Sequence, residues 1–253
     1  MLRQERHREI SQLIRENGKA TVVELSRLFR VSKSTIRRDL EQLDEHGVIQ
    51  RAHGGALVAE HTAPEPPVIQ RIVEKAEEKR RIGRAAADLV LDGESIFIGS
   101  GTTTLEVARN LADRENLTVI TNALNVANVL AGHSNVTLVV VGGLLRHSEL
   151  SMLGYIAEQA IKELNADKVV MGMRAIDTDY GLTSDYLPET MTDRAIIQSG
   201  RQLILVADHS KLGKVSTALV APTTALHTLV TDSAASMNFV TKLRELGVQV
   251  ILA

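Results

Sequence analysis

The sequence predicts two folded domains: a small all-α head that closes with a β-hairpin, and a larger α/β domain built on a mainly parallel sheet. Before residue 58, three short segments place apolar residues at helical spacing, and two apolar runs then flank Gly54-Gly55. Beyond residue 94, seven short runs rich in β-branched residues alternate with helical segments. A chain of 253 residues can hold one small domain and one with a substantial core.

Two helices and their ends can be placed in the first 30 residues. The first helix is expected to end near Asn17-Gly18, because glycine favours the C-cap region. Thr21 followed by Glu24 is a capping box that opens a second helix. The residues expected to face the core are apolar and helically spaced: Ile10, Leu13 and Ile14 in the first helix, and Leu25, Leu28 and Phe29 in the second.

A third helix begins after Ser32, which is the expected N-cap, and it has two different faces. One face is an apolar stripe at spacings of four and three, formed by Ile36, Leu40 and Leu43. Ser34, Arg37 and Arg38 lie elsewhere on the helical wheel, where no core requires them. Hydroxyl groups suit phosphates and base edges, and the arginine fork matches phosphate or guanine, so this helix is a candidate for the DNA major groove.

The hairpin that follows strengthens this interpretation. Val48 to Arg51 and Ala56 to Val58 flank the Gly-Gly turn, and three helices with a hairpin form a winged helix-turn-helix. The residues expected to contact double-stranded operator DNA come from the third helix and the wing: Ser32, Lys33, Ser34, Thr35, Arg37, Arg38, Arg51 and His53. The competing interpretation is that Arg37 and Arg38 belong to the solvated face of an ordinary helix. The capping signals and the hairpin favour DNA binding.

The charge distribution agrees with DNA binding at one end of the chain. Residues 1–57 hold 11 Lys and Arg against 8 Asp and Glu, a net charge of +3, whereas the remainder has −5. The whole chain carries −2, so its overall charge implies no polyanion. Aromatic residues make up 2% of the chain, which argues against recognition of single strands by base stacking.

Composition also excludes several kinds of chemistry. The chain has 0 cysteines, so disulfides, cysteine zinc sites and thiol nucleophiles are excluded. The 8 histidines show no metal-binding spacing, so we expect neither a metal nor another cofactor. We find no signal peptide and no apolar run of membrane-spanning length, and we therefore expect a cytoplasmic protein that does not contact the membrane.

The sequence predicts a domain boundary at a proline-rich stretch. Three of the 5 prolines fall between residues 64 and 67, which predicts a stiff, extended linker. We expect a DNA-binding domain at 1–58, the linker at 59–68 and an effector-sensing domain at 69–253. One charged helix is predicted from Ile69 to Val90, with these residues buried: Ile72, Ala76, Ile82, Ala86 and Leu89.

The large domain is expected to contain seven strands with helices between them. The predicted strands are Ser95–Ile98, Leu117–Thr121, Val136–Val141, Lys168–Met171, Leu203–Val206, Leu229–Val230 and Val248–Leu252. Most of these runs lack polar and apolar alternation, which predicts strands that are covered on both faces. A mainly parallel α/β sheet follows from this pattern.

The loop after the first predicted strand is suited to an anion. Residues 99–104 carry two glycines and three threonines and open a helix, so backbone N–H groups, hydroxyls and the helix dipole can all favour a phosphate. No Lys-Ser or Lys-Thr pair follows the glycines, so this is not a Walker A loop. The alternative is an ordinary turn at a helix N-terminus.

Polar residues follow other strands at the same predicted sheet edge, where ligands gather in open α/β sheets. The residues expected to bind an effector are Ser100, Gly101, Thr102, Thr103, Thr104, Thr121, Asn122, Gly142, Gly143, Asp177 and Lys211. For some of them a simpler interpretation stays open: Thr121 and Asn122 as turn formers, and Lys211 as a surface lysine. The prediction depends on several polar loops meeting at one edge.

These motifs resemble those of the DeoR family of bacterial regulators of sugar catabolism. In the head the resemblance is carried by Ile36 to Leu40 followed by Arg51 to Ala56. In the body it is carried by Gly101 to Thr104, Thr121-Asn122, Gly142-Gly143, Asp177, Gly181 to Thr183 and Asp208 to Lys211. The resemblance implies a body similar in fold to ribose-5-phosphate isomerase. It also implies a phosphorylated sugar or polyol effector that changes operator affinity, and a homodimer or homotetramer.

Three positions depart from the family pattern. Gly99 stands where the family often has an aspartate, Met173-Arg174-Ala175 replaces a small, glycine-rich stretch, and Asp193 replaces a common lysine. We interpret Arg174 either as a second anion contact or as a residue that fills part of the pocket. These changes bear on which ligand binds.

Two other functions compete with a repressor that senses a sugar phosphate. An isomerase with a DNA-binding head would need a carboxylate base, for which Asp177 and Glu189 are available, but no isomerase-type acidic-glycine cluster surrounds Asp177. A regulator of a non-phosphorylated ligand would use residues 99–104 only as structure. We therefore expect a regulator and not an enzyme.

Overall fold

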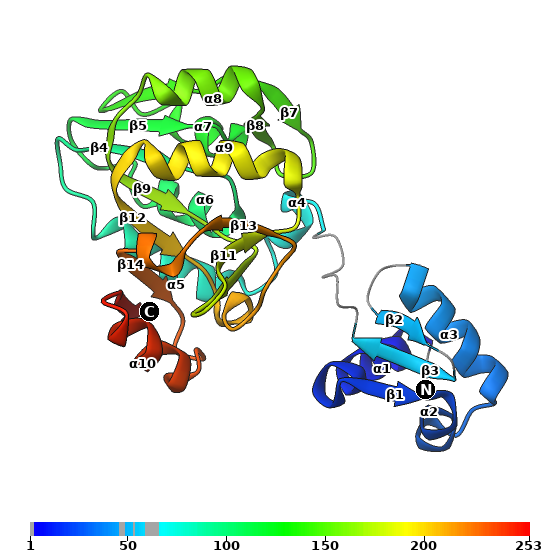
Figure 1. Ribbon diagram of the computed structural model, residues 1–253. Helices are drawn as coiled ribbons and strands as arrows, with labels where there is room; N and C mark the ends of the chain where they lie inside the picture. The colour runs from blue at the N-terminus through cyan, green and yellow to red at the C-terminus, as the bar shows by residue number, and fades with distance from the viewer. Residues whose placement is uncertain (1–2, 46–48, 53, 59–65) are drawn as a thin grey trace. The chain divides into compact units, whose positions relative to one another are not determined.

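The computed structural model describes residues 3–45, 49–52, 54–58 and 66–253, and the chain divides into two compact units, Met1–Glu65 and Pro66–Ala253 (Figure 1). The division falls within the linker predicted at 59–68. Residues 59–65 of that linker, together with Val48 and His53, lie outside the described residues.

The N-terminal unit contains three helices and a small antiparallel sheet. The helices are α1 Arg3–Asn17, α2 Val22–Phe29 and α3 Lys33–Glu45, and the strands are β1 Lys19–Thr21, β2 Ile49–Ala52 and β3 Gly55–Val58. The strand order is β1-β3-β2, and β2 and β3 form the predicted hairpin. β1 was not predicted, because three residues carry too little alternation to indicate a strand.

The predicted helix caps are present. Thr21 Oγ1 accepts a hydrogen bond from the Glu24 N–H at 3.2 Å, and Glu24 Oε2 accepts one from the Thr21 N–H at 2.8 Å, which completes the capping box. Ser32 Oγ accepts from the Thr35 N–H at 3.1 Å at the start of α3. Between these helices, Arg30 adopts the left-handed conformation, with φ 54°, and turns the chain.

The core of this unit contains most of the predicted apolar residues, with one exception. The buried members include Ile10, Ile14, Leu25, Ile36, Leu40 and Leu43. Leu28 was predicted to face inward, and this is wrong, because the residue is 58% exposed. The inward stripe of α2 consists of Val22, Leu25 and Phe29, and Leu28 lies beyond the edge of that stripe.

The C-terminal unit is built on a parallel sheet of seven strands, each of which overlaps one predicted run. In spatial order the strands are β15 Gln249–Leu252, β14 Thr228–Thr231, β12 Gly200–Val206, β9 Ala166–Met171, β4 Ser95–Ile98, β5 Leu117–Thr121 and β6 Val136–Val140. Every neighbouring pair in this sheet is parallel. The carboxyl ends of the strands therefore share one edge.

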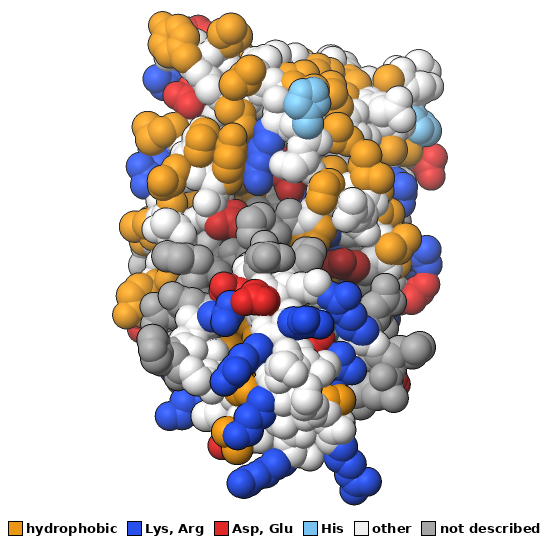
Figure 2. Space-filling model, turned by 90° about the vertical axis from the view of Figure 1, so that its right-hand side faces the viewer, with side chains coloured by type: hydrophobic (Ala, Val, Ile, Leu, Met, Phe, Trp, Pro, Cys, Tyr) orange, Lys and Arg blue, Asp and Glu red, His pale blue; other side chains and the backbone are white. Residues whose placement is uncertain are grey.

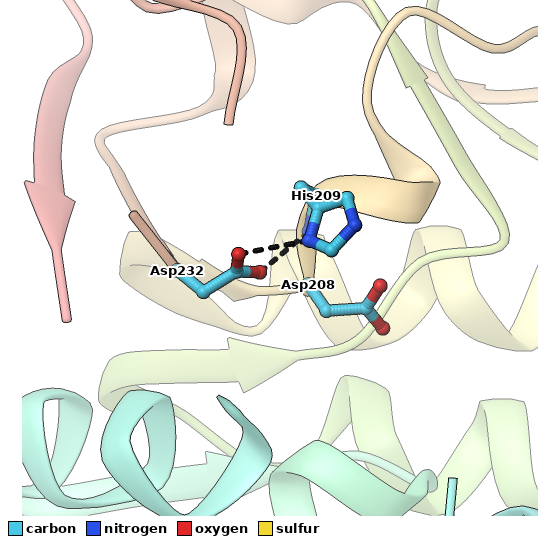
Figure 3. A group of neighbouring side chains, drawn as sticks. All are labelled: Asp208, His209 and Asp232. Carbon is cyan, nitrogen blue, oxygen red and sulfur yellow. Dashed lines mark hydrogen bonds and ion pairs between the residues drawn. The ribbon is translucent and has the colours of Figure 1, made fainter. Parts of the chain in front are cut away.

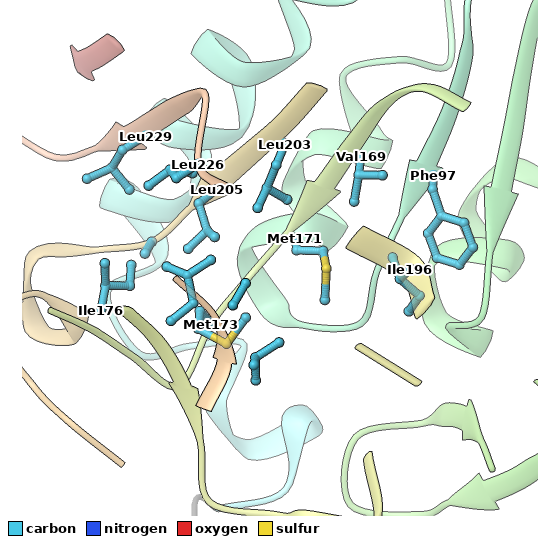
Figure 4. Close-up of a cluster of buried hydrophobic side chains, with 14 of the residues drawn as sticks. Phe97, Val169, Met171, Met173, Ile176, Ile196, Leu203, Leu205, Leu226 and Leu229 are labelled. Carbon is cyan, nitrogen blue, oxygen red and sulfur yellow. The ribbon is translucent and has the colours of Figure 1, made fainter. Parts of the chain in front are cut away.

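Helices cover both faces of the sheet, which explains why its strands lack polar alternation. Along β4, Phe97 faces one core while Ile96 and Ile98 face the other. One face packs on α5 Ala76–Ala87, α6 Thr102–Arg109 and α7 Leu124–Leu130. The other packs on α8 Tyr155–Lys162, α9 Leu187–Gln198 and α10 Met237–Glu245, in the core shown in Figure 4.

Several short elements of this unit were not predicted. They are the hairpin of β7 Leu144–Arg146 and β8 Ser151–Leu153, and an antiparallel sheet of β10 Ala175–Asp177, β11 Gly181–Ser184 and β13 Ala218–Ala221. Two 3-10 turns, η1 His209–Lys211 and η2 Thr223–Ala225, complete the list. Segments of three or four residues are too short for a periodic pattern to reveal.

The single helix predicted from Ile69 to Val90 is wrong. The segment forms α4 Val68–Arg71 and α5, with a break at Lys75, which has φ 49°. Lys75 Nζ donates to Asp208 Oδ1 at 2.9 Å and lies 3.2 Å from His209 Nε2, so contacts from a distant loop accompany the break. Among the residues predicted to be buried, Ile82 and Ala86 are fully buried, whereas Ile72, Ala76 and Leu89 are half-buried.

No helix in the described part of the chain is both long enough and apolar enough to cross a membrane.

Candidate functional site

The outer face of α3 carries the predicted DNA contacts. Ser32, Lys33, Ser34, Arg37 and Arg38 are exposed, and Thr35 is half-buried. Within the described residues, the guanidinium groups of Arg37 and Arg38 have no ion-pair or hydrogen-bond partner. Lysine and arginine side chains are numerous in the lower part of the face shown in Figure 2. Unpaired guanidinium groups beside hydroxyls form a surface that can contact phosphates and base edges.

Of the two residues predicted on the wing, Arg51 is among the described residues and bonds to α3. Arg51 is exposed, and its Nη1 donates to Glu41 Oε1 of α3 at 2.7 Å, while its backbone N–H donates to Asp44 Oδ1 at 3.0 Å. These bonds tie β2 to α3 and orient the wing relative to the helix. His53 lies outside the described residues.

At the sheet edge, the N-terminus of α6 is open to an anion. Gly101 precedes the helix with φ 137°, a conformation that favours glycine, and no side chain caps the first turn. The backbone N–H groups of this turn have no partner within the helix. Thr104 Oγ1 donates to the Gly101 carbonyl at 3.1 Å, but in the described part of the chain the hydroxyls of Thr102 and Thr103 have no hydrogen-bond partner, although both residues are largely buried.

Lys79 lies beside this helix terminus, and the sequence did not reveal it. α5 and α6 pack so closely that a Cβ on Gly83 would lie 2.5 Å from Glu106 Cβ. Both helices run away from the carboxyl edge of the sheet, so one turn earlier Lys79 is level with Thr102. The residue is 6% exposed, and its Nζ donates to the Arg71 carbonyl at 2.6 Å.

Burial lowers the pKa of Lys79, and the charges of Asp208 and Lys211 also act on it. A buried ammonium with a neutral carbonyl as acceptor favours a compensating anion nearby. Lys79 and the first turn of α6 therefore bring a positive charge and free donors to the same end of two packed helices.

The loop after β12 brings further charges to the same edge. Asp208 is buried and accepts from the Ser210 N–H at 2.9 Å and from Lys75 Nζ at 2.9 Å. Although burial opposes its ionisation, hydrogen bonds from Ser210 and Lys75 lower the pKa of Asp208 to about 2. The predicted effector residue Lys211 is half-buried in η1 of this loop.

Asp208, His209 and Asp232 form a compact group, shown in Figure 3. Their potential ligand atoms lie within 4.8 Å of one another, which is close enough to hold a metal ion. However, His209 Nδ1 lies 2.8 Å from Asp232 Oδ1, and Asp232 Oδ2 accepts from the His209 N–H at 2.7 Å. Internal hydrogen bonds thus account for these side chains, and we assign no metal to them.

Two predicted effector residues have local structural roles. Thr121 is fully buried, donates to the Ile98 carbonyl at 2.7 Å and accepts from the Ala123 N–H at 3.1 Å. Asp177 lies at the tip of the β10-β11 hairpin, where its Oδ1 accepts from the N–H groups of Asp179 and Tyr180 at 2.9 and 3.1 Å. We leave both residues out of the proposed site.

Asn122 has an unfilled hydrogen-bonding capacity. Because β5 pairs with β4, with Thr121 opposite Ile98, Asn122 lies beside the loop that leads to α6. The residue is 2% exposed, and its Nδ2 donates to the Met152 carbonyl at 2.8 Å. Its Oδ1 is buried and has no partner among the described residues. A buried acceptor in this position can receive a ligand hydroxyl.

In the predicted pair Gly142-Gly143, the structure gives a packing role to Gly143, where a side chain would not fit. A Cβ on Gly143 would lie 2.8 Å from the Leu153 carbonyl oxygen, so glycine lets β7 approach β8. Gly142 is exposed, and nothing lies near it.

The departures Arg174 and Asp193 also have defined surroundings. Arg174 Nε donates to Asp185 Oδ2 at 3.0 Å, so this arginine pairs within its own chain segment. Burial, followed by the negative charge of Glu189, raises the pKa of Asp193 well above its usual range.

A cavity of about 340 Å³ lies next to the β12 loop, and no sequence pattern indicated it. It is lined by His209, Leu212, Gly213, Ala234, Ser236, Asn238, Phe239 and Lys242. These residues come from two loops and α10, and only the fold brings them together.

The chain belongs to the DeoR family. The family's helix-turn-helix domain matches residues 6–62, and its C-terminal sensor domain matches residues 74–233. The class is thus a DNA-binding transcriptional regulator with a sensor domain.

Curated relatives identify the kind of regulator. The chain is 37% identical to the glycerol-3-phosphate regulon repressor of Escherichia coli, over 85% of this chain and 84% of the relative. It is 36% identical to the transcriptional repressor AccR of Agrobacterium fabrum, over 91% and 90%. It is 34% identical to the transcriptional repressor CsqR of Escherichia coli, over 98% and 94%. The protein is accordingly a transcriptional regulator and not an enzyme.

Among solved structures, the chain is similar to ribose 5-phosphate isomerase A of Methanocaldococcus jannaschii, with a TM-score of 0.41 and 17% identity over 55% of each chain. It is also similar to the isomerase of Neisseria gonorrhoeae, with a TM-score of 0.40 and 15% identity over 55% of this chain and 53% of that one. Neither likeness bears on the function.

Proposed function

We propose that the protein represses a sugar or polyol catabolic operon and that a phosphorylated sugar or polyol controls it. The observation that supports this most is the buried ammonium of Lys79 beside the uncapped N-terminus of α6. A phosphate placed there receives backbone N–H groups, the hydroxyls of Thr102 and Thr103, and a full positive charge.

The remainder of the site suits a polyhydroxy carbon chain. Asn122 Oδ1 offers an unused acceptor. Lys211 lies in η1, in the loop that follows β12 at the same edge of the sheet. The effector site that we propose consists of Lys79, Ser100, Gly101, Thr102, Thr103, Thr104, Asn122 and Lys211. The printed name of one relative, the glycerol-3-phosphate regulon repressor, supports a small phosphorylated effector.

On the DNA side, we propose that α3 enters the major groove of the operator. Arg37 and Arg38 are exposed, and Ser32, Lys33, Ser34 and Thr35 precede them at the start of the helix. Arg51 on the wing would exchange Glu41 for a DNA phosphate. A homodimer or homotetramer in the cytoplasm would present two such helices to two half-sites.

Communication between the sites would pass through the segment Pro66–Arg71, which follows the link to the head. Arg71 Nε donates to the Pro66 carbonyl at 2.7 Å, and the Arg71 guanidinium pairs with Glu149. The Val68 N–H donates to the Ser148 carbonyl at 2.7 Å. These contacts anchor the segment to the body, and Lys79 Nζ adds a hydrogen bond to the Arg71 carbonyl. An anion that draws Lys79 toward α6 would break that bond and weaken the anchor.

Isothermal titration calorimetry with matched ligands tests the proposed effector class. Glycerol 3-phosphate and hexose 6-phosphates are titrated alongside glycerol and the free hexoses. We expect heat only from phosphorylated compounds, and we expect Lys79→Met and Thr103→Ala to weaken that binding at least tenfold, about 1.4 kcal/mol. A free sugar that binds as tightly as its phosphate to all three proteins would overturn the proposed site.

A further inference from the structure

The recognition helix α3 contains a buried charge that DNA contact does not explain. Asp39 directly follows Arg38, yet it is 2% exposed. Its carboxylate accepts from Arg6 Nε at 2.6 Å, from Arg6 Nη2 at 3.1 Å and from His7 Nε2 at 3.0 Å. Arg6 and His7 belong to α1, so this cluster joins two helices that are distant in sequence.

Both partners of the ion pair are charged. Burial opposes ionisation of Asp39, but the hydrogen bonds from Arg6 and His7 hold the pKa of this carboxyl below its usual range. The hydrogen bond to Asp39 in turn raises the pKa of Arg6. A buried ion pair of this kind contributes little net stability, because desolvation offsets the attraction and apolar residues of similar volume often serve as well.

The ion pair constrains the orientation of α3 relative to α1. Most of the other buried residues that the structure describes in α1 and α3 are apolar, among them Ile10 and Ile14 of α1 and Ile36 and Leu40 of α3. Apolar burial is non-directional and permits small rotations of one helix on the other. A bidentate arginine–carboxylate fork fixes both the rotation and the axial position of α3.

We propose that Asp39, held by Arg6, is the positioning residue that sets how α3 presents Arg37 and Arg38 to base edges. This proposal rests on the proposed role of α3 in reading DNA. Base contacts depend on the orientation of the helix, whereas phosphate contacts tolerate small shifts. Loss of the fork should therefore reduce sequence discrimination more than it reduces binding to any duplex.

The double variant Arg6→Met/Asp39→Leu tests this, because it removes the fork without leaving an unpaired charge. The probes are a duplex that the wild-type protein selects from a random library and a scrambled duplex of equal composition. We expect affinity for the selected duplex to fall about tenfold or more, while affinity for the scrambled duplex stays within about twofold.

Arg6→Lys provides a second test that keeps the charge and loses the fork, and it decides the question if the double variant does not fold. We expect it to lower the ratio of the two affinities several-fold. Either variant, if folded and still discriminating like the wild type, overturns the positioning role.

Glu24→Gln is the control for general destabilisation, because it weakens the α2 capping box, in which Glu24 bonds to Thr21 and not to Arg6 or Asp39. It should lower the melting temperature and leave the ratio unchanged. Arg38→Ala separates the two hypotheses. Unchanged affinity for both duplexes in that variant would overturn the role of α3 in DNA reading, whereas reduced affinity leaves Asp39 to be judged by its own variants.

Discussion

Asp208 shows how a single side chain ties stability to pH. Its folded-state pKa is lowered from 3.8 to about 2, so the ionised carboxylate stabilises the fold above the unfolded pKa. That contribution, about 2 kcal/mol, is lost as the pH falls from about 4 to 2, because the unfolded state then binds the proton more readily. Lys75 and Ser210 lose a negatively charged acceptor when the carboxyl is protonated.

We predict that the free energy of unfolding of the wild-type protein falls across this acid window more steeply than that of Asp208→Asn. Urea titrations at several pH values between 5 and 2 measure this difference. Parallel pH profiles for the two proteins would contradict the assignment.

At the residue scale the sequence predicted what a helical wheel can show. The exposure of Arg37 and Arg38 and the burial of Ile36 and Leu40 follow from spacing alone. Lys79 could not be predicted in the same way, because a lysine in a charged helix looks solvated. Its burial depends on the packing of α5 against α6, which is a tertiary fact.

The contact between α5 and α6 determines where the ammonium and the helix terminus meet. A methyl group on Gly83 would lie 2.5 Å from Glu106 Cβ and 2.7 Å from its backbone carbon, and a backbone atom cannot move aside easily. The Gly83→Ala change should therefore separate the two helices, at a cost of about 1–3 kcal/mol.

We predict that Gly83→Ala lowers thermal stability and weakens phosphate binding together. Gly132→Ala is the control, since nothing lies within 4 Å of a Cβ there, and it should leave both properties unchanged. Differential scanning calorimetry and ligand titration measure the pair. Wild-type ligand affinity in Gly83→Ala would show that the close packing does not shape the site.

Helices and strands could be predicted where the apolar pattern in the sequence was long enough to be recognised. The seven strands of the main sheet carry apolar residues on both faces, and each was placed from sequence. β7, β8, β10, β11 and β13 span only three or four residues. The break between α4 and α5 escaped prediction because Lys75 takes its left-handed conformation in company with Asp208 and His209, which are distant in sequence.

At the scale of the whole molecule, we expect the contacts that anchor Pro66–Arg71 to couple effector binding to DNA binding. Glu149→Gln removes the charge that pairs with Arg71 and loosens this segment without touching the residues proposed to hold the effector. We predict that effector affinity stays within about threefold of the wild type while DNA affinity no longer responds to the effector, a loss of coupling of about 1–3 kcal/mol.

Glu94→Gln is the matched control, because it breaks the partly buried pair of Lys168 and Glu94 (2.7 Å) at the opposite edge of the sheet. Fluorescence anisotropy with labelled DNA measures the response of each variant. A normal response in Glu149→Gln, or an equal loss in Glu94→Gln, would contradict a path through Arg71.

The most direct measurement is the affinity of the full-length protein for its selected duplex, at fixed salt, with and without each phosphorylated sugar or polyol. We predict that one such compound shifts the dissociation constant about 5- to 150-fold in the wild type. We predict no shift in Lys79→Met, because this variant lacks the ammonium proposed to hold the phosphate. A wild-type protein that no phosphorylated compound affects, or a Lys79→Met variant that responds in full, would contradict the account.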